Sequence, residues 1–220
     1  MNDNYSKQLI LNLRTLPSMG REDYIVSQIN EEAVAWLDTW PKWPSLGLII
    51  CGPSGCGKSH LASALQTISN GFIIEAQNLT ESKLSKLVEN KCLIIEDIHE
   101  YKSERLLLHL YNMMVERNHN LMFTSNMSVS DIDFKLPDLK SRLLSMPHIN
   151  IGLPDDNLLK CLMLKQFSDK GVLVDFEVID YLIKRIDRSF ESIIKIVSKI
   201  NNLSLEKSKK ITIPFIKKVL

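Results

Sequence analysis

One eight-residue segment constrains the fold of this chain more than any other feature: Gly52-Pro53-Ser54-Gly55-Cys56-Gly57-Lys58-Ser59. It has the spacing G-x-x-x-x-G-K-S of a phosphate-binding P-loop. An apolar run precedes it at 46–51 and a helical pattern follows it at 60–68, which is the strand–loop–helix context that the motif requires. The glycines let successive backbone N–H groups turn towards an anion, and the following helix adds its positive dipole end. A nucleotide-binding loop is therefore predicted; the alternative is an ordinary Gly/Ser-rich turn.

Side chains at the end of this segment have separate predicted roles. Lys58 would neutralise the β- and γ-phosphates, and Ser59 would hold Mg²⁺ through its hydroxyl. His60 opens the helical run and belongs to the same predicted cofactor-binding set. Against this, a lysine is most often a solvated surface residue.

Apolar runs alternate with helical patterns through the first two thirds of the chain. We expect a helix that begins at Glu31, with Asn30 as its cap, and that ends before Pro41. Strands are predicted at 46–51, 72–75, 92–96, 120–124 and 148–151, and helices at 58–69, 80–90, 103–118 and 137–145. This alternation is typical of an α/β fold, a parallel five-stranded sheet with flanking helices. Beyond Pro154 the pattern is helical throughout, at 155–170, 175–186, 189–205 and a last turn after Pro214, which predicts a small all-helical domain from about 154 to 220.

Two predicted strands end in polar side chains that suit nucleotide chemistry. Leu93 to Ile95 lead into Glu96 and Asp97, where one carboxylate could hold the hydration shell of Mg²⁺ and the other could orient the attacking water. The run 121–123 leads into Thr124 and Asn126, and either could reach the γ-phosphate, because ligands lie at the carboxyl ends of parallel strands. The alternatives are a strand that happens to end in acids and a simple polar strand end.

Two arginines complete the candidate set. Arg142 lies just before the fifth strand, and Arg188 lies where one C-terminal helix gives way to the next. Arginine is suited to bidentate phosphate contacts. Taken alone, each is more often a surface ion-pair residue.

Together these motifs resemble the DnaA-related AAA+ family, and most of all its Hda-type regulators. The resemblance covers essentially the whole chain and rests on the P-loop, the acidic strand end, the TSN strand end and four further segments, 20–24, 30–36, 137–143 and 211–217. It implies an AAA+ core at 23–153 and a helical lid at 154–220. It implies ADP or ATP with Mg²⁺ as cofactors.

The resemblance also implies roles for single residues. Arg142 would be the arginine finger directed at a neighbouring subunit's nucleotide, and Arg188 the sensor 2 arginine. Asn126 would lie at sensor 1, and the segment from Tyr24 to Asn30 would form part of the adenine pocket. One departure is Glu96, because this family usually has Asp at that position; the chain's own ATPase activity is therefore expected to be weak.

The N-terminal tail, residues 1–22, contains Gln8-Leu9-Ile10-Leu11-Asn12-Leu13, which resembles the peptide by which Hda-type proteins dock on the DNA polymerase III sliding clamp. Gln8 would hydrogen-bond at a pocket rim, while Leu9, Leu11 and Leu13 belong to the clamp-binding set and the last two fill an apolar groove. The alternative is a first β-strand or a segment packed on the core.

The resemblance implies a regulator that stimulates hydrolysis of DnaA-bound ATP and so limits initiation of chromosome replication. Its partners would be DnaA and the clamp, with self-association as a further candidate contact and with DNA contacted through the clamp. Its location would be the bacterial cytoplasm, at the nucleoid. The alternative function is an autonomous AAA+ ATPase of the DnaC or loader type, acting on a helicase or on DNA.

Charge and cysteine content exclude several other classes. A net charge of +1 argues against a strongly basic nucleic-acid-binding surface, although residues 195–220 hold seven lysines and one acid, Glu206. That region is either a solvated helix face or a contact for an acidic partner. The four cysteines have no metal-site spacing, and Cys51 and Cys92 lie in apolar runs where we expect them to be buried. No run of 18 apolar residues is present, so no membrane span is expected.

Overall fold

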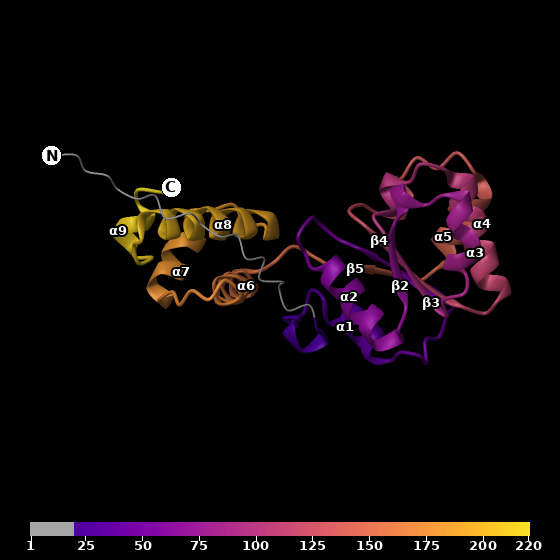
Figure 1. Ribbon diagram of the computed structural model, residues 1–220, viewed down its shortest axis with the longest axis horizontal. Coiled ribbons are helices and arrows are strands. Elements are labelled where there is room, and N and C mark those ends of the chain that lie inside the picture. The colour runs from indigo at the N-terminus through magenta and orange to yellow at the C-terminus, as the bar shows by residue number, and fades with distance from the viewer. Residues whose placement is uncertain (1–19) are drawn as a thin grey trace. The chain divides into compact units, whose positions relative to one another are not determined.

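The computed structural model describes residues 20–220, which divide into two compact units (Figure 1). We call residues 20–153 the core unit and residues 154–220 the lid unit. The predicted clamp-binding residues Gln8, Leu9, Leu11 and Leu13 lie outside the described residues.

The core unit is built on a parallel five-stranded sheet, which confirms the predicted fold class. Its strands are β1 (Gly47–Cys51), β2 (Phe72–Glu75), β3 (Cys92–Glu96), β4 (Asn120–Ser125) and β5 (His148–Asn150), in the spatial order β2-β3-β4-β1-β5. All of β1, and β3 up to Ile95, is buried, as expected for strands that are covered on both faces.

Helices cover both faces of the sheet (Figure 1). One face has α1 (Glu31–Asp38) and α2 (Lys58–Ser69), and the other has α3 (Glu81–Leu87), α4 (Glu104–Glu116) and α5 (Pro137–Ser145). Leu93 and Ile95 of β3 pack in one apolar cluster with α3, α4 and α5. Because strand side chains alternate between faces, Ile94 and Glu96 project towards the face covered by α2.

The order of the strands brings three polar strand ends to one edge of the sheet. β4 lies between β1, which leads into the P-loop, and β3, which leads into Asp97. The Gly52 N–H donates to the Ser125 carbonyl at 3.1 Å, and the Asp97 N–H donates to Thr124 Oγ1 at 3.0 Å. These bonds fix the ends of β1, β4 and β3 to one another.

The lid unit consists of four helices around an apolar centre. They are α6 (Asp156–Ser168), α7 (Phe176–Ile183), α8 (Phe190–Lys207) and α9 (Ile213–Ile216). Phe167, Leu182, Val197 and Ile216 are among the side chains that are almost fully buried there. Asp155 caps α6 by accepting the Leu158 N–H at 2.7 Å. No helix within residues 20–220 has the length and apolarity needed to cross a membrane.

The predicted capping role of Asn30 is wrong. Asn30 precedes α1, but its side chain makes no hydrogen bond to the helix. Its Oδ1 accepts the Ser27 N–H at 2.8 Å and its Nδ2 donates to the Ile25 carbonyl at 3.0 Å. The chain turns tightly before α1, so the buried amide satisfies the polar groups of that turn instead of the helix end.

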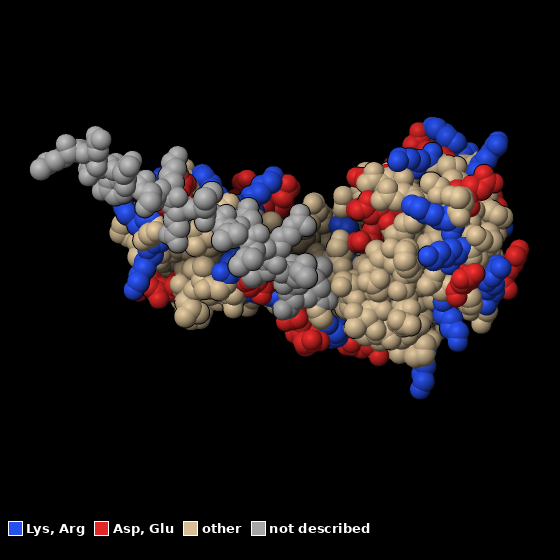
Figure 2. Space-filling view, viewed as in Figure 1, with Lys and Arg blue, Asp and Glu red and all other residues tan. Residues whose placement is uncertain are grey.

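Charged side chains of both signs are interspersed over the face of the core unit that Figure 2 shows, in the region of α3, α4 and α5. This mixture agrees with the small net charge of the chain. The buried cysteines Cys51 and Cys92 match the prediction, and Cys56 is buried as well.

Candidate nucleotide-binding site

The P-loop joins β1 to α2 through a backbone that only glycine adopts without strain. Gly55 and Gly57 have φ angles of +78° and +97°, in the left-handed region. A Cβ added at Gly57 would lie 2.8 Å from the Tyr24 ring. Ser54, Gly55 and Ser59 are exposed, so the loop presents its outer rim to solvent. This loop, followed directly by the N-terminus of a 12-residue helix, has the form of an anion-binding site.

Lys58 spans the loop from its place in the first turn of α2. Its Nζ donates to the Gly52 carbonyl at 2.8 Å and to the Pro53 carbonyl at 3.1 Å, and it lies 3.9 Å from Cys56 Sγ. The side chain is 7% exposed. A buried ammonium held by carbonyls of the loop places a positive charge where phosphate oxygens would be bound. Burial also raises the pKa of the Cys56 thiol, which keeps it neutral beside that charge.

Tyr24 and His60 pack beside the P-loop. The Tyr24 hydroxyl donates to the Cys56 carbonyl at 3.4 Å, and its ring meets the His60 ring edge-on with centroids 5.1 Å apart. His60 Nε2 lies 2.7 Å from the Gly20 carbonyl. Burial raises the pKa of Tyr24 far above its ordinary value, so the phenol is a neutral donor. The segment that contains Tyr24 and Asn30 is therefore fixed directly against the P-loop.

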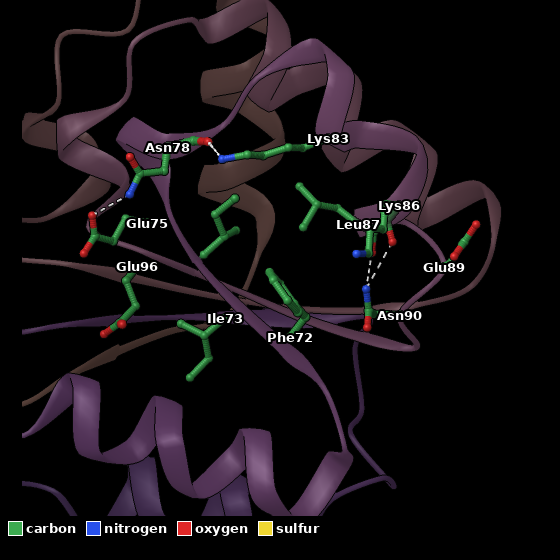
Figure 3. Close-up of a pocket in the computed structure, with 11 residues that line it drawn as sticks. Phe72, Ile73, Glu75, Asn78, Lys83, Lys86, Leu87, Glu89, Asn90 and Glu96 are labelled. Carbon is green, nitrogen blue, oxygen red and sulfur yellow. Dashed lines mark hydrogen bonds between the residues drawn. The ribbon is translucent and has the colours of Figure 1, made fainter. Parts of the chain in front are cut away.

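The two carboxylates at the end of β3 occupy different environments. Glu96 is half-buried and lines a groove of about 660 Å³ along the edge strand β2, where Figure 3 shows it projecting on the same side as Ile73 and away from Lys83 and Leu87 of α3. Asp97 has a left-handed backbone, with φ +53°, which turns the chain into η3 (Ile98–Glu100). Aspartate is one of the few residues that adopt this conformation at low cost.

The end of β4 is organised by a residue that the sequence analysis did not single out. Thr124 is 1% exposed and accepts the Asp97 N–H, whereas Asn126 is exposed. His99, in η3, lies against Asn126: its Nδ1 is 3.4 Å from the Asn126 backbone nitrogen, and its Nε2 is 3.2 Å from the Asn126 carboxamide. The sequence signal for His99 is its place two residues after the acidic pair Glu96 and Asp97.

Arg142 lies on α5, outside the P-loop edge. Its Nε donates to Asp138 Oδ1 at 2.9 Å, one helical turn earlier, and its guanidinium lies 5.7 Å from the centre of the Tyr111 ring. The side chain is 39% exposed. The guanidinium is thus oriented by two neighbours and is open to solvent.

Arg188 lies between α7 and α8 of the lid unit. Its Nη2 lies 3.3 Å from Asp156 Oδ2, and its side chain is 71% exposed. A single long ion pair of this kind contributes little to stability. Arg188 is therefore weakly held within the lid unit.

The residues at the P-loop edge fit a nucleotide with a divalent cation. The left-handed glycines and the buried ammonium suit phosphate oxygens, and the exposed hydroxyl of Ser59 suits a hard cation. The described residues contain no group of three or more His, Cys, Asp or Glu side chains that would bind a metal on its own. Magnesium at this site would therefore depend on phosphate oxygens and water as well as on Ser59, Glu96 and Asp97.

Two family models match parts of the chain. Residues 155–220 match the model described as "Hda, lid domain", and residues 48–131 match the model described as "RNA helicase". The second range contains the P-loop, the acidic end of β3 and all of β4.

Known proteins with a related sequence or fold include initiators of replication. Over 200 residues the chain is 26% identical to the chromosomal replication initiator protein DnaA of Buchnera aphidicola subsp. Cinara cedri, covering 79% of this chain and 45% of that protein. The chain thus spans less than half the length of this relative. Domain III of DnaA from Thermotoga maritima superposes with a TM-score of 0.77 at 16% identity, covering 93% of this chain and 96% of the domain.

The chain is thus similar to DnaA in sequence and in fold, and its residues 155–220 match an Hda lid domain.

A second solved DnaA contains a bound nucleotide analogue. AMPPCP-bound DnaA from Aquifex aeolicus superposes with a TM-score of 0.69 at 17% identity, covering 86% of this chain and 65% of that one. At these identities the likeness concerns the fold. The resemblance to DnaA and to Hda that was expected from the motifs is confirmed, and the P-loop of the core unit suggests nucleotide binding.

Proposed function

We propose that this DnaA-related AAA+ protein is a regulator of replication initiation. It binds ADP or ATP with Mg²⁺, docks on the DNA polymerase III sliding clamp, and stimulates hydrolysis of the ATP bound to DnaA. The observation that carries this proposal is Arg142, a guanidinium that is oriented by Asp138 and Tyr111 and yet open to solvent. Such a group is available to a nucleotide held by another protein.

The proposed nucleotide site is the P-loop edge of the core unit. Residues 52–57 would surround the phosphates with backbone N–H groups, and Lys58 would neutralise their charge. Ser59, Glu96 and Asp97 would hold Mg²⁺ and its water shell. Tyr24, Asn30 and His60 would shape the part of the site that binds the adenine base. Contacts of Tyr24 and His60 already hold the segment 20–30 against the P-loop, and Asn30 holds the turn within that segment. Arg188 would reach the phosphates from the lid.

In this role Arg142 acts on the ATP of DnaA. Negative charge on the γ-phosphoryl oxygens must be stabilised in the transition state, and a guanidinium does so by bidentate hydrogen bonds. The ion pair with Asp138 is an exposed helical pair, so redirecting Arg142 costs less than about 1 kcal/mol. Arginine fingers supplied in trans accelerate hydrolysis by about 10³–10⁵.

Clamp docking is proposed for Gln8, Leu9, Leu11 and Leu13. A single short peptide binds weakly, with a Kd on the order of micromolar. Several copies presented to one ring-shaped clamp would gain from effective concentration. This docking would place the regulator at the nucleoid in the bacterial cytoplasm, with DNA contacted through the clamp.

The chain's own turnover is proposed to be slow. Glu96 is one methylene longer than the aspartate that this family usually has there, so its carboxylate would be less well placed to hold Mg²⁺ and to activate water. The bound nucleotide would then serve mainly to order the lid (154–220) on the core (23–153), with residues 1–22 as the docking tail.

The deciding experiment measures phosphate release from purified DnaA–ATP, with this protein present, with and without DNA-loaded clamp. We expect stimulation that needs the clamp and disappears in Gln8→Ala. Arg142→Ala should abolish stimulation while keeping nucleotide and clamp binding. Arg105→Ala, an exposed arginine on α4, is the matched control and should retain stimulation. ATP hydrolysis by this protein alone, without any effect on DnaA, would instead favour the loader-type ATPase.

A further inference from the structure

His99 occupies a fixed position between two strand ends of the candidate site. It lies in η3, directly after the left-handed Asp97 that ends β3. Its side chain is 11% exposed, and it lies against Asn126, which follows β4. Neither the family motifs nor the proposed function gives His99 a role.

The hydrogen bonds of His99 determine where its proton lies. A backbone N–H can only donate, so the Asn126 N–H requires Nδ1 of His99 to be an acceptor without a proton. A neutral imidazole with a bare Nδ1 has its proton on Nε2. The carboxylate of Glu100, 4.0 Å from Nε2, favours a proton at that nitrogen.

This tautomer in turn determines which end of the Asn126 carboxamide faces the ring. Nε2–H needs an acceptor, and the carboxamide atom 3.2 Å away satisfies it only if that atom is Oδ1. Half a turn of the carboxamide exchanges its oxygen and nitrogen without moving the other heavy atoms. When Oδ1 of Asn126 accepts the hydrogen bond from His99, both N–H groups of the Asn126 carboxamide can donate to another partner.

The position of Asn126 suggests which group would accept hydrogen bonds from its side-chain NH₂ group. Asn126 follows Ser125, whose carbonyl accepts the N–H of Gly52 at the start of the P-loop. It is exposed, so its free amide is open to a ligand. Phosphate oxygens only accept hydrogen bonds, and an Asn that turned its oxygen towards them would repel them.

We propose that His99 is a positioning residue that orients the Asn126 carboxamide, so that its NH₂ group donates to the terminal phosphate of a bound nucleoside triphosphate. This inference rests on the proposed nucleotide site and gives that site a means of distinguishing a triphosphate from a diphosphate. His99 itself would not touch the nucleotide.

The first test compares affinities in the full chain. The quantity is the ratio of the Kd for AMPPCP to the Kd for ADP, measured by calorimetry in the presence of Mg²⁺. Asn126→Ala should raise this ratio by roughly 10-fold, and His99→Phe, which keeps a ring without nitrogens, by roughly 3- to 10-fold. His99→Gln, which can both accept and donate, should recover most of the loss.

A double variant separates positioning from a structural role. His99→Phe combined with Asn126→Ala should give the ratio of Asn126→Ala alone, because His99 acts through Asn126. His109→Ala, at an exposed histidine on α4, is the control and should leave the ratio unchanged. Additive effects of the two substitutions, or an unchanged ratio in His99→Phe, would overturn the proposal.

The second test needs no nucleotide. A long-range ¹H–¹⁵N correlation spectrum of the free protein, at a pH where the imidazole is neutral, should show the Nε2–H tautomer for His99, assigned by its loss in His99→Gln. A spectrum with the proton on Nδ1 would refute the proposal. Both tests are independent of DnaA: failure to stimulate DnaA would leave them intact, whereas failure here would leave stimulation by Arg142 untouched.

Discussion

The P-loop edge of the core unit and the lid unit hold their polar residues in different ways. At the P-loop edge, Lys58 and Thr124 are buried and hydrogen-bonded to backbone groups of neighbouring segments. In the lid unit, Arg188 is exposed with one long ion pair, and the buried Asn201 has a side-chain oxygen without a partner among the described residues. The P-loop edge is therefore pre-organised for a ligand, whereas Arg188 of the lid unit is not.

The largest expected effect is on nucleotide affinity, and it sharpens this contrast. Lys58→Ala should weaken ADP binding by about 100-fold, because a pre-positioned buried charge is lost. Arg188→Ala should weaken it by only about 10-fold, because this exposed side chain must first be ordered. Calorimetric titration of both variants with ADP and Mg²⁺ provides the measurement. Lys86→Ala, at an exposed lysine on α3, is the control. If Arg188→Ala lost as much ADP affinity as Lys58→Ala, the proposed difference in pre-organisation would be contradicted.

The second comparison uses two glycines with similar backbones. Gly57 and Gly171 both have left-handed φ angles, but a Cβ at Gly57 would meet the Tyr24 ring, whereas nothing lies within 4 Å of one at Gly171. Gly171→Ala should therefore cost about 1 kcal/mol of unfolding free energy, from backbone strain alone. Gly57→Ala should cost about 2–4 kcal/mol, because the clash adds to the strain. Urea unfolding measures both costs. Equal values would show that the Tyr24 ring moves away from the new methyl group without an energetic cost.

A third pair of substitutions should change stability in opposite directions. Thr124→Val keeps the shape of the side chain but leaves the Asp97 N–H without its acceptor, so it should cost about 1–2 kcal/mol. Asn201→Leu removes the unpartnered oxygen from the apolar centre of the lid and should stabilise it by about 1 kcal/mol. Chemical unfolding of each variant measures the sign of the change in the free energy of unfolding. Destabilisation by Asn201→Leu would imply that the side chain of Asn201 makes a stabilising polar contact.

The smallest effect concerns an exposed ion pair of the core unit. Hydrogen bonds from Arg21 lower the pKa of the Asp38 carboxyl. The folded pKa of Asp38 is below the unfolded one, so the stabilisation is fully present above the unfolded pKa of about 4 and is lost as the pH falls through the folded pKa. Asp38→Asn should cost a few tenths of a kcal/mol at pH 7 and low salt. Urea unfolding should show this cost at pH 7 and less of it as the pH is lowered through the folded pKa of Asp38. A cost that does not change with pH would exclude the ion pair as its cause.

Much of the core unit could be predicted from local patterns. The P-loop spacing, the apolar runs and the acids at Glu96 and Asp97 are local signals, because a strand buried on both faces must be apolar along its length. Helices 58–69 and 137–145 have the predicted limits, while the predicted helix 80–90 is shorter, at Glu81–Leu87. Helix ends depend on tertiary contacts that the local pattern does not contain.

The sequence alone determined the class of fold, the P-loop and the identity of the residues at the strand ends, since these depend on short-range spacing and side-chain chemistry. Only the tertiary structure decided the strand order β2-β3-β4-β1-β5, the packing of Tyr24 against Gly57, the turn held by Asn30 and the contact between His99 and Asn126. Each of these joins segments that are brought together by packing of the whole unit or by turn geometry. Such contacts depend on backbone paths that residue spacing does not specify.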